Sequence, residues 1–337
     1  MLDYIILTLD NKLKIKHYIF TQMTFDRNSW FDIAFGFKES EANVKNNIEI
    51  FPETHSMLIK PKSVIRKFGE FKIKSLSDYP EPSLFPGSFK IVIGNGRRTK
   101  HIEKIDSKLM QFDNKKYNGS TFQVASNFNC LEFMTPFQKR SEGITNYAFD
   151  PTQGPNCCLA CPYSILWRNY FMEPVNLLDE TDICVDPPGS GYPLINSSHR
   201  CEYNFDKLKF KVGVQYGCEV FNEDIFVNHV FCASLSFGQG VQPSELNYAL
   251  NFELLKVEYR LTILAAMESN SNYLILTLLG AGVFKAPIND IIRAIEYNMD
   301  LILNSGLKVK LIIFDGNRIS DSLIKRLSKY GSVKYVK

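Results

Sequence analysis

The C-terminal part of the chain alternates apolar runs of strand length with helix-like segments, and this order most limits the folds available to it. We expect a helix over 246–269, a strand over 273–279, a helix over 287–304, a strand over 309–314 and a closing helix over 319–330. Strands and helices that alternate with short connections form parallel sheets with right-handed crossovers. The sequence therefore predicts an α/β sheet protein.

Earlier segments supply more strands for such a sheet. Apolar, β-branched runs predict strands at 89–93, 121–126, 210–220 and 227–237. Pro155 suits the first position of a helix that reaches about residue 170, and Pro162 is expected to kink or break this helix.

Composition bounds the class of protein. The 337 residues are 45% hydrophobic and 22% charged, which is enough apolar material for a large core and too much for a disordered chain. The formal net charge of +3 is too small to indicate a nucleic-acid partner. The N-terminal residues lack the features of a signal peptide, and no apolar run approaches the length of a membrane helix. We therefore expect a cytoplasmic protein with no membrane partner.

Cysteines and histidines offer one candidate metal site. Cys157, Cys158 and Cys161 are closely spaced, and His199 and Cys201 are the nearest further ligands. Because the three cysteines lie on an expected helix without a second pair at ligand spacing, core packing is the better interpretation. We expect no metal and no cofactor. His229 lies in an expected strand and is interpreted as a hydrogen-bonded sheet residue rather than a base.

A glycine-rich turn follows the expected strand over 273–279. It reads Gly280, Ala281, Gly282, Val283, Phe284. Glycines here allow positive φ and close approach of the backbone to a ligand, and the next helix start offers free N–H groups to a phosphate. The turn lacks the Walker sequence and the dinucleotide spacing. A phosphate-binding turn and a tight turn without a ligand both stay open.

The loop that begins at Asp150 is a second candidate. It reads Asp150, Pro151, Thr152, Gln153, Gly154 and leads into the expected helix at Pro155. The loop can supply a phosphate site and a carboxylate. The alternative is that Asp150 or Thr152 only caps the helix. Two such loops in one α/β domain suit a diphosphate better than a single phosphate.

Several motifs together resemble a known family. The C-terminal order of strand, Gly-Ala-Gly-Val-Phe turn, helix, strand and helix resembles that of macrodomains, which are ADP-ribose-binding α/β/α modules. The set of motifs over 122–132, 150–155, 168–171, 191–192, 213–215 and 230–234 resembles the divergent MavL-like branch, whose members are arginine-specific ADP-ribosyl hydrolases. The likeness runs from about Phe35 to the C-terminus.

This resemblance implies a fold and a division of the chain. The implied fold is a three-layer α/β/α macrodomain-like mixed sheet with an elaborated N-terminal segment. We expect residues 1–110 to be an extension packed on the core, and residues 111–337 to be the ADP-ribose-binding core with an insertion around 172–208.

The resemblance also implies ligand-binding residues. Asn129 matches the macrodomain asparagine that faces the distal ribose, and Asn127 belongs to the same polar loop. The implied diphosphate-binding residues lie in the two glycine-containing loops: Thr152, Gln153, Gly154, Gly280, Ala281, Gly282, Val283 and Phe284.

For catalysis the resemblance implies aspartates around the distal ribose. Asp150 is the first candidate, and Glu219 or Asp224 is the candidate for a second carboxylate. The implied activity is an ADP-ribosyl hydrolase that removes ADP-ribose from modified protein side chains, with arginine as the modified residue. One alternative is a reader that binds ADP-ribose or an ADP-ribosylated protein without chemistry. Another is a nucleotide or poly-ADP-ribose binder in a larger assembly, docked through residues 1–110.

Overall fold

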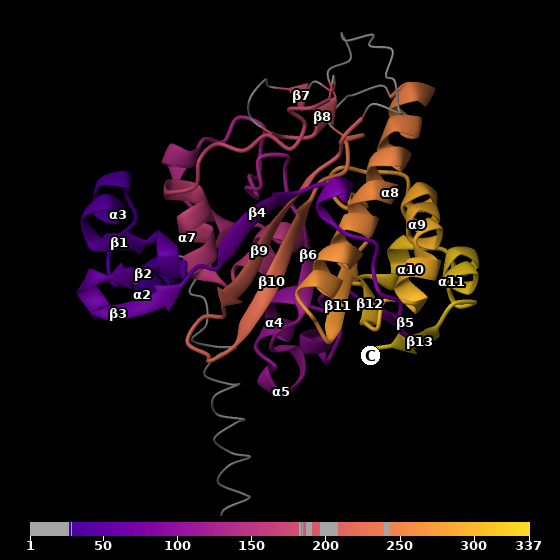
Figure 1. The fold of residues 1–337 in the computed structure, drawn as a ribbon, viewed down its shortest axis with the longest axis horizontal. Coiled ribbons are helices and arrows are strands. Elements are labelled where there is room, and N and C mark those ends of the chain that lie inside the picture. Colours follow the sequence, from indigo (N-terminus) through magenta and orange to yellow (C-terminus); the bar gives the residue numbers. More distant parts are fainter. Residues whose placement is uncertain are drawn as a thin grey trace, which may run out of the picture.

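An eight-stranded mixed sheet forms the centre of the molecule (Figure 1). The computed structural model describes residues 27, 29–181, 183, 185–186, 191–195, 208–238 and 243–337. The strand order is β13-β5-β12-β11-β6-β10-β9-β4. The strands are β4 (Glu70–Lys74), β5 (Ser88–Ile93), β6 (Thr121–Ala125), β9 (Val212–Glu219), β10 (Phe226–Cys232), β11 (Tyr273–Thr277), β12 (Lys308–Ile313) and β13 (Ser332–Tyr335).

The six strands from β13 to β10 run parallel, so their carboxyl ends meet at one edge of the sheet. The strand β9 pairs antiparallel with β10, and β4 pairs antiparallel with β9. This geometry decides which loops can share a site, because a loop that follows β9 lies at the opposite edge.

Helices cover both faces of the sheet and make the three layers (Figure 1). One face packs against α4 (Ser107–Gln111), α5 (Asn114–Tyr117), α6 (Gln153–Cys158) and α7 (Pro162–Tyr170). The other packs against α8 (Glu245–Glu268), α9 (Ile288–Tyr297), α10 (Met299–Leu303) and α11 (Asp321–Leu327). The predicted three-layer α/β/α mixed sheet is therefore confirmed.

The predicted elements are present, with differences at prolines and chain ends. Pro162 breaks the expected helix into α6 and α7, because it begins the second helix at its first position. The expected helix over 287–304 is also two helices, joined at Asn298. The short edge strand β13 was not predicted; it pairs with β5 over four residues.

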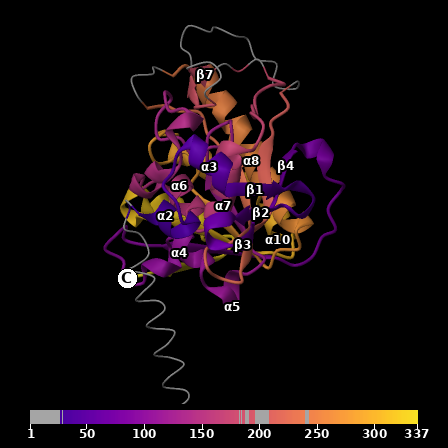
Figure 2. The same ribbon diagram turned by 90° about the vertical axis from the view of Figure 1, so that its left-hand side faces the viewer.

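The N-terminal part divides differently from the expectation. A separate layer contains α2 (Trp30–Phe35), α3 (Glu41–Asn47) and the antiparallel strands β1 (Ile48–Phe51), β2 (Ser56–Ile59) and β3 (Val64–Lys67), and Figure 2 shows this layer facing the viewer. In contrast, β4 and β5 precede residue 110 but belong to the central sheet. A boundary at residue 110 therefore does not follow the fold, because it separates two strands from the sheet they complete.

Short elements fill the connections. The region expected as an insertion contains the two-stranded pair β7 (Val185–Asp186) and β8 (Leu194–Ile195), and much of the rest of 182–207 lies outside the described residues. The 3₁₀ turns are Pro52–Thr54, Lys60–Lys62, Leu76–Asp78, Ile102–Lys104, Arg140–Glu142, Thr145–Phe149 and Gly316–Arg318. Among the described helices, none has the length and apolar character needed to cross a membrane.

Candidate functional site

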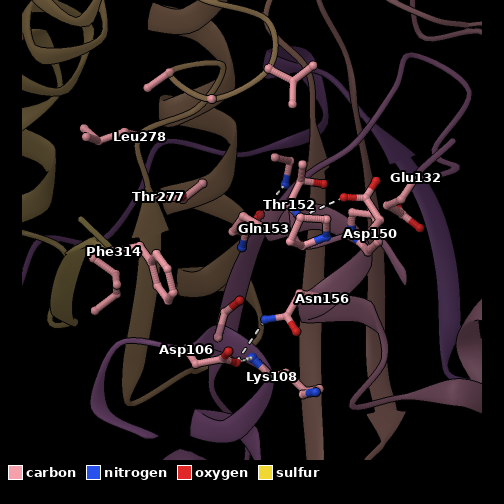
Figure 3. A pocket seen from close by; sticks show the side chains of 18 of the residues that line it. Asp106, Lys108, Glu132, Asp150, Thr152, Gln153, Asn156, Thr277, Leu278 and Phe314 are labelled. Atoms are coloured by element: carbon pink, nitrogen blue, oxygen red, sulfur yellow. Dashed lines mark hydrogen bonds between the residues drawn. The ribbon is translucent and has the colours of Figure 1, made fainter. Parts of the chain in front are cut away.

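A pocket of about 1060 Å³ opens at the carboxyl edge of the parallel strands (Figure 3). Its walls include five segments that are far apart in sequence: the connection between β5 and α4, and the loops that follow β6, η6, β11 and β12, where η6 is the 3₁₀ turn Thr145–Phe149. Small-molecule pockets usually measure about 300–1,000 Å³. The volume therefore suits a large ligand.

The glycine-rich turn after β11 lines this pocket along residues 280–284. Gly280 has φ +82°, and a Cβ there would lie 1.9 Å from Ser234 Oγ, so both backbone and space require glycine. A Cβ on Gly282 would meet nothing within 4 Å. Within the described part of the chain, no group accepts from the N–H groups of Gly282, Val283 and Phe284. The turn thus presents three donors without partners.

Asp150 lines the pocket at the end of the 3₁₀ turn Thr145–Phe149. Its Oδ1 accepts a hydrogen bond from the Thr152 N–H at 2.7 Å, which fixes the direction of the carboxylate. No described residue donates to its Oδ2. Asp150 therefore brings a positioned carboxylate oxygen without a partner to the site.

Gln153 and Gly154 hold the start of α6 against β6. The Gln153 side chain accepts from Ala125 N–H at 2.8 Å and donates to the Gln123 carbonyl at 2.9 Å. A Cβ on Gly154 would lie 1.7 Å from the Ala125 carbonyl oxygen. Gln153 lines the pocket with Thr152, whereas Gly154 does not. The close packing of α6 on β6 accounts for the glycine at 154.

The two asparagines of the loop after β6 are placed differently. Asn127 lines the pocket, and its side-chain amide donates to the Phe133 carbonyl at 3.3 Å. Asn129 is not among the lining residues; its Oδ1 accepts from Leu131 N–H at 3.0 Å. A Cβ on Gly191 would contact the Asn129 side chain, so Asn129 packs beneath the loop rather than into the pocket.

Glu132 is a lining residue that sequence reasoning did not select. It lies beside Asp150 on the same side of the pocket in Figure 3 and is 2% exposed. Its Oε2 forms an ion pair with Arg168 at 2.8 Å, and its Oε1 accepts from the Ser126 hydroxyl at 3.1 Å. Both oxygens of Glu132 therefore have partners inside the protein.

Arg168 is completely buried on α7 and holds this network together. It donates to the Cys130 carbonyl at 3.0 Å and to Gln215 Oε1 at 2.8 Å, and its guanidinium lies 4.1 Å from the Phe231 ring centroid. Burial alone would lower the pKa of Arg168, but the charge of Glu132 outweighs it and raises the pKa above the usual range. The available sequence signal was an arginine that follows the apolar run Ile165, Leu166, Trp167.

The far end of the pocket has a different character. Asp106 caps α4, and its Oδ1 accepts from the backbone of Lys108 and Leu109 and from the Asn156 amide at 2.9, 3.1 and 3.0 Å. Phe314, which is 40% exposed, lines the same pocket on the opposite side of Figure 3 from Asp150. Burial lowers the pKa of Lys108.

The structure does not bring Glu219 or Asp224 to the pocket. Glu219 ends β9, which runs antiparallel to its neighbour, so it lies at the amino edge of the parallel strands. Its carboxylate pairs with Arg66 at 2.8 Å and accepts from Lys67 N–H at 2.7 Å. Asp224 lies in the turn between β9 and β10 at that same edge. The direction of β9 thus removes both residues from the set that can act beside Asp150.

The cysteines and His229 have partners in the core. Cys157, Cys158 and Cys161 are buried, and burial raises the pKa of Cys157 to about 12. His229 Nε2 lies 2.9 Å from Gln111 Oε1, and burial lowers the pKa of His229 to about 3. Among the described residues no group of three or more His, Cys, Asp or Glu can hold a metal ion, and His199 and Cys201 lie outside them.

Comparison with known proteins gives likenesses of fold at low identity. No protein-family model matches the chain, and no curated protein matches its sequence. Poly(ADP-ribose) glycohydrolase from Deinococcus radiodurans in complex with ADP-ribose is 11% identical with a TM-score of 0.45, over 77% of this chain and 94% of that one. The Thermomonospora curvata glycohydrolase is 9% identical, with a TM-score of 0.41, over 82% and 90%.

A macrodomain from Oceanobacillus iheyensis with MES bound is also similar in structure. It is 16% identical, with a TM-score of 0.36, over 65% of this chain and 87% of that one. With identities this low, the function of this chain has to be inferred from its own residues.

Proposed function

We propose that this chain binds ADP-ribose in the carboxyl-edge pocket and hydrolyses the bond that joins ADP-ribose to a protein side chain, with arginine as the modified residue. One observation carries the proposal. Five segments distant in sequence meet around a pocket of about 1060 Å³ that has a positioned carboxylate and three backbone N–H groups without an acceptor among the described residues. The macrodomain-like motifs in the sequence support the same ligand.

The diphosphate is assigned to the turn over 280–284. Backbone N–H groups bind phosphate oxygens without adding a charged side chain, and Gly282 leaves room for close approach. The rigid neighbours of Gly280 hold the turn in place before the ligand arrives. The ligand is therefore positioned by a preformed backbone surface rather than by long flexible cations.

The adenine is assigned to the end near Asp106 and Phe314. Phe314 exposes a ring on which a base can stack, and stacking tolerates any base with a π face. Asp106 uses its Oδ1 in the cap of α4, and no described residue donates to its Oδ2. That oxygen can accept a hydrogen bond from the exocyclic amine of adenine.

The distal ribose is then assigned to the end with Asp150 and Asn127. Cleavage of an N-glycosidic bond develops positive charge at the sugar C1 and O5, which a neighbouring carboxylate stabilises. Asp150 offers its free Oδ2 to a water molecule or to the guanidinium of the modified arginine. Glu132 acts differently, because Arg168 and Ser126 occupy its oxygens and Arg168 neutralises its charge; it shapes the wall at this end.

The proposal is tested in two steps on the full chain. Calorimetric titration of ADP-ribose is expected to show one site, and the wild type is expected to release ADP-ribose from an arginine-ADP-ribosylated protein. The variant Asp150→Asn should bind ADP-ribose and release far less of the label. Asp224→Asn is the matched control, because it makes the same change at the opposite edge and should leave release unchanged.

Each alternative result has a clear meaning. Binding without release from arginine-, serine- or acid-linked substrates would make the chain a reader of ADP-ribose. Release that Asp150→Asn leaves unchanged would exclude the assigned catalytic end. No binding of ADP-ribose would overturn the proposal.

A further inference from the structure

Lysines occupy a face of the central sheet where neighbouring positions carry core residues. On the face that packs against α4 to α7, Lys310 of β12 lies in register with Lys90 of β5. Two residues further along, Ile312 and Val92 belong to the hydrophobic core. Inner strands of parallel sheets are usually apolar on both faces. A pair of lysines at this position therefore needs an explanation beyond sheet formation.

Two tyrosine rings bring the amines of Lys310, Lys116 and Lys308 close together. Lys310 Nζ donates to the Tyr117 hydroxyl at 2.8 Å and lies 4.8 and 4.5 Å from the ring centroids of Tyr117 and Tyr273. Lys116 Nζ lies 5.0 Å from the Tyr117 centroid, and Lys308 Nζ lies 5.4 Å from that of Tyr273. Cation–π contacts hold ammonium groups over rings without neutralising them. The rings therefore concentrate positive charge.

No ion pair among the described residues involves this lysine cluster, which we define as Lys90, Lys116, Lys308 and Lys310. The charge of Asp113 acts on Lys310, but more weakly than the charges of Lys116 and Lys90. Like charges on directly opposed residues of neighbouring strands are destabilising. The fold thus keeps a repulsive arrangement that a bound anion would relieve.

The titration of Lys310 agrees with this geometry. Burial, followed by the neighbouring amine of Lys116, lowers the pKa of Lys310 to about 7. The titratable groups around its amine are Lys90, Lys116, Lys308, Tyr117, Tyr273 and Asp113. Since an anion stabilises the ammonium form, binding of an anion near neutral pH must draw a proton onto Lys310.

We propose that the lysine cluster binds a multivalent phosphate-type anion at a site separate from the carboxyl-edge pocket. Lys308 and Lys310 lie in the first half of β12, whereas the pocket begins at Ile312 in its second half. Compact ammonium groups on flexible stems suit phosphate oxygens, and four of them match a ligand with more than one negative charge. Free polyphosphate and the phosphate groups of a phosphoprotein share this chemistry.

The test uses inorganic pyrophosphate and two amine-removing variants. Pyrophosphate is titrated calorimetrically at pH 7.0 in two buffers of different ionisation enthalpy, with ADP-ribose present to fill the pocket. The wild type is expected to bind with uptake of roughly half a proton, because a group with a pKa of about 7 is half protonated at this pH. Lys310→Met and Lys90→Met should each weaken binding at least tenfold, and Lys310→Met should abolish the proton uptake.

Controls separate this site from a general surface effect and from the pocket. Lys325→Met removes an exposed lysine on α11 and should leave pyrophosphate binding unchanged. Removing a charge from a repulsive cluster should not lower the melting temperature, which checks that the variants fold. Tripolyphosphate and a phosphoserine peptide, titrated in parallel, distinguish a free polyphosphate from a phosphoprotein as the source.

Three results would overturn the proposal. They are the absence of saturable binding, binding that both Lys310→Met and Lys90→Met leave within twofold, and binding without proton uptake. Each of them is independent of whether ADP-ribose binds in the pocket, because the variants lie outside it.

Discussion

At the carboxyl edge of the central sheet Asp150 keeps one oxygen without a donor among the described residues, whereas at the amino edge both oxygens of Glu219 are engaged. Glu219 pairs with Arg66 and with the backbone of Lys67, so it joins the N-terminal layer to β9. Asp150 uses one oxygen in its own loop and turns the other toward a pocket. The two carboxylates have the same chemistry and opposite availability.

This difference follows from how the chain connects its strands. The walls of the carboxyl-edge pocket include the connection from β5 to α4, the loops that follow β6, β11 and β12, and the turn before α6, and these segments leave a space between them. At the amino edge a short turn joins β9 to β10, and β3 packs close to its end. Glu219 at the crowded edge has partners for both oxygens, whereas Asp150 keeps one oxygen without a donor among the described residues, although Glu132 beside it is fully paired. Burial and strand direction, rather than residue type, thus decide which acid can act on a ligand.

The largest expected effect comes from breaking the ion pair behind the pocket. Arg168→Met leaves Glu132 buried without its partner, which should lower the free energy of unfolding by about 3–5 kcal/mol. Chemical denaturation measures this loss. The double variant Arg168→Met with Glu132→Gln should recover part of it, because no unpaired charge remains. A loss below about 0.5 kcal/mol in the single variant, as for an ordinary surface change, would contradict the structural role of Arg168.

The next largest effect comes from neutralising one carboxylate at each edge of the sheet. Asp150→Asn should lower the turnover number for ADP-ribose release by about 10²–10³-fold, the usual result of removing one group that stabilises developing charge. Glu219→Gln should leave turnover within about twofold and instead destabilise the fold by about 1–3 kcal/mol, since it weakens a buried charged contact. Release assays and thermal denaturation on both variants measure the comparison. Equal losses of turnover would erase the distinction between the edges.

His229 lies on β10, and its protonation should make the free energy of unfolding depend on pH. Burial lowers the pKa of His229 to about 3, whereas the unfolded residue titrates near 6.5. Between these values the unfolded chain binds a proton that the folded chain does not, so stability is lost as pH falls. The loss should reach about 2 kcal/mol between pH 7 and pH 5.

The variant His229→Gln should remove this part of the acid sensitivity. Each variant is compared with itself at the two pH values by urea denaturation, so that its baseline stability cancels. Parallel losses in wild type and variant would show that His229 does not carry the effect.

The smallest expected effects come from replacing Gly280 or Gly282 of the turn with alanine. Gly280→Ala meets Ser234 and a positive φ, and should cost about 1–2 kcal/mol of stability. Gly282→Ala has open space and ordinary backbone, and should change stability by less than about 0.5 kcal/mol while weakening ADP-ribose binding. Denaturation and calorimetry on the pair measure both. Unchanged binding in Gly282→Ala would remove this turn from the proposed diphosphate site.

Local signals predicted one side of the molecule well. The helices α8 to α11 and strands β11 and β12 follow from apolar runs, glycines and prolines that act within a few residues. The break at Pro162 is also a local effect, because proline has no backbone N–H to donate inside a helix, whatever the rest of the fold.

Contacts between distant residues were not predictable in this way. Glu132 and Arg168 are 36 positions apart, and Glu219 and Arg66 are 153 apart, so no local pattern predicts either ion pair. Because β9 runs antiparallel to β10, Glu219 and Asp224 lie at the edge opposite the pocket. The direction of a strand depends on the whole sheet, so the residues near it do not predict this placement. The lining loops at 150–154 and 280–284 could be identified from sequence, whereas the lining segments after β5 and β12 and the hydrogen-bond partners of each carboxylate could not.

Hydrogen–deuterium exchange with and without ADP-ribose reports on the backbone N–H groups that are proposed to bind the diphosphate. We expect ADP-ribose to slow exchange in peptides that cover 280–284 and 150–153, with no change in peptides that cover 219–225 at the amino edge. Binding of ADP-ribose that leaves exchange over 280–284 unchanged would contradict the assignment of the carboxyl-edge pocket.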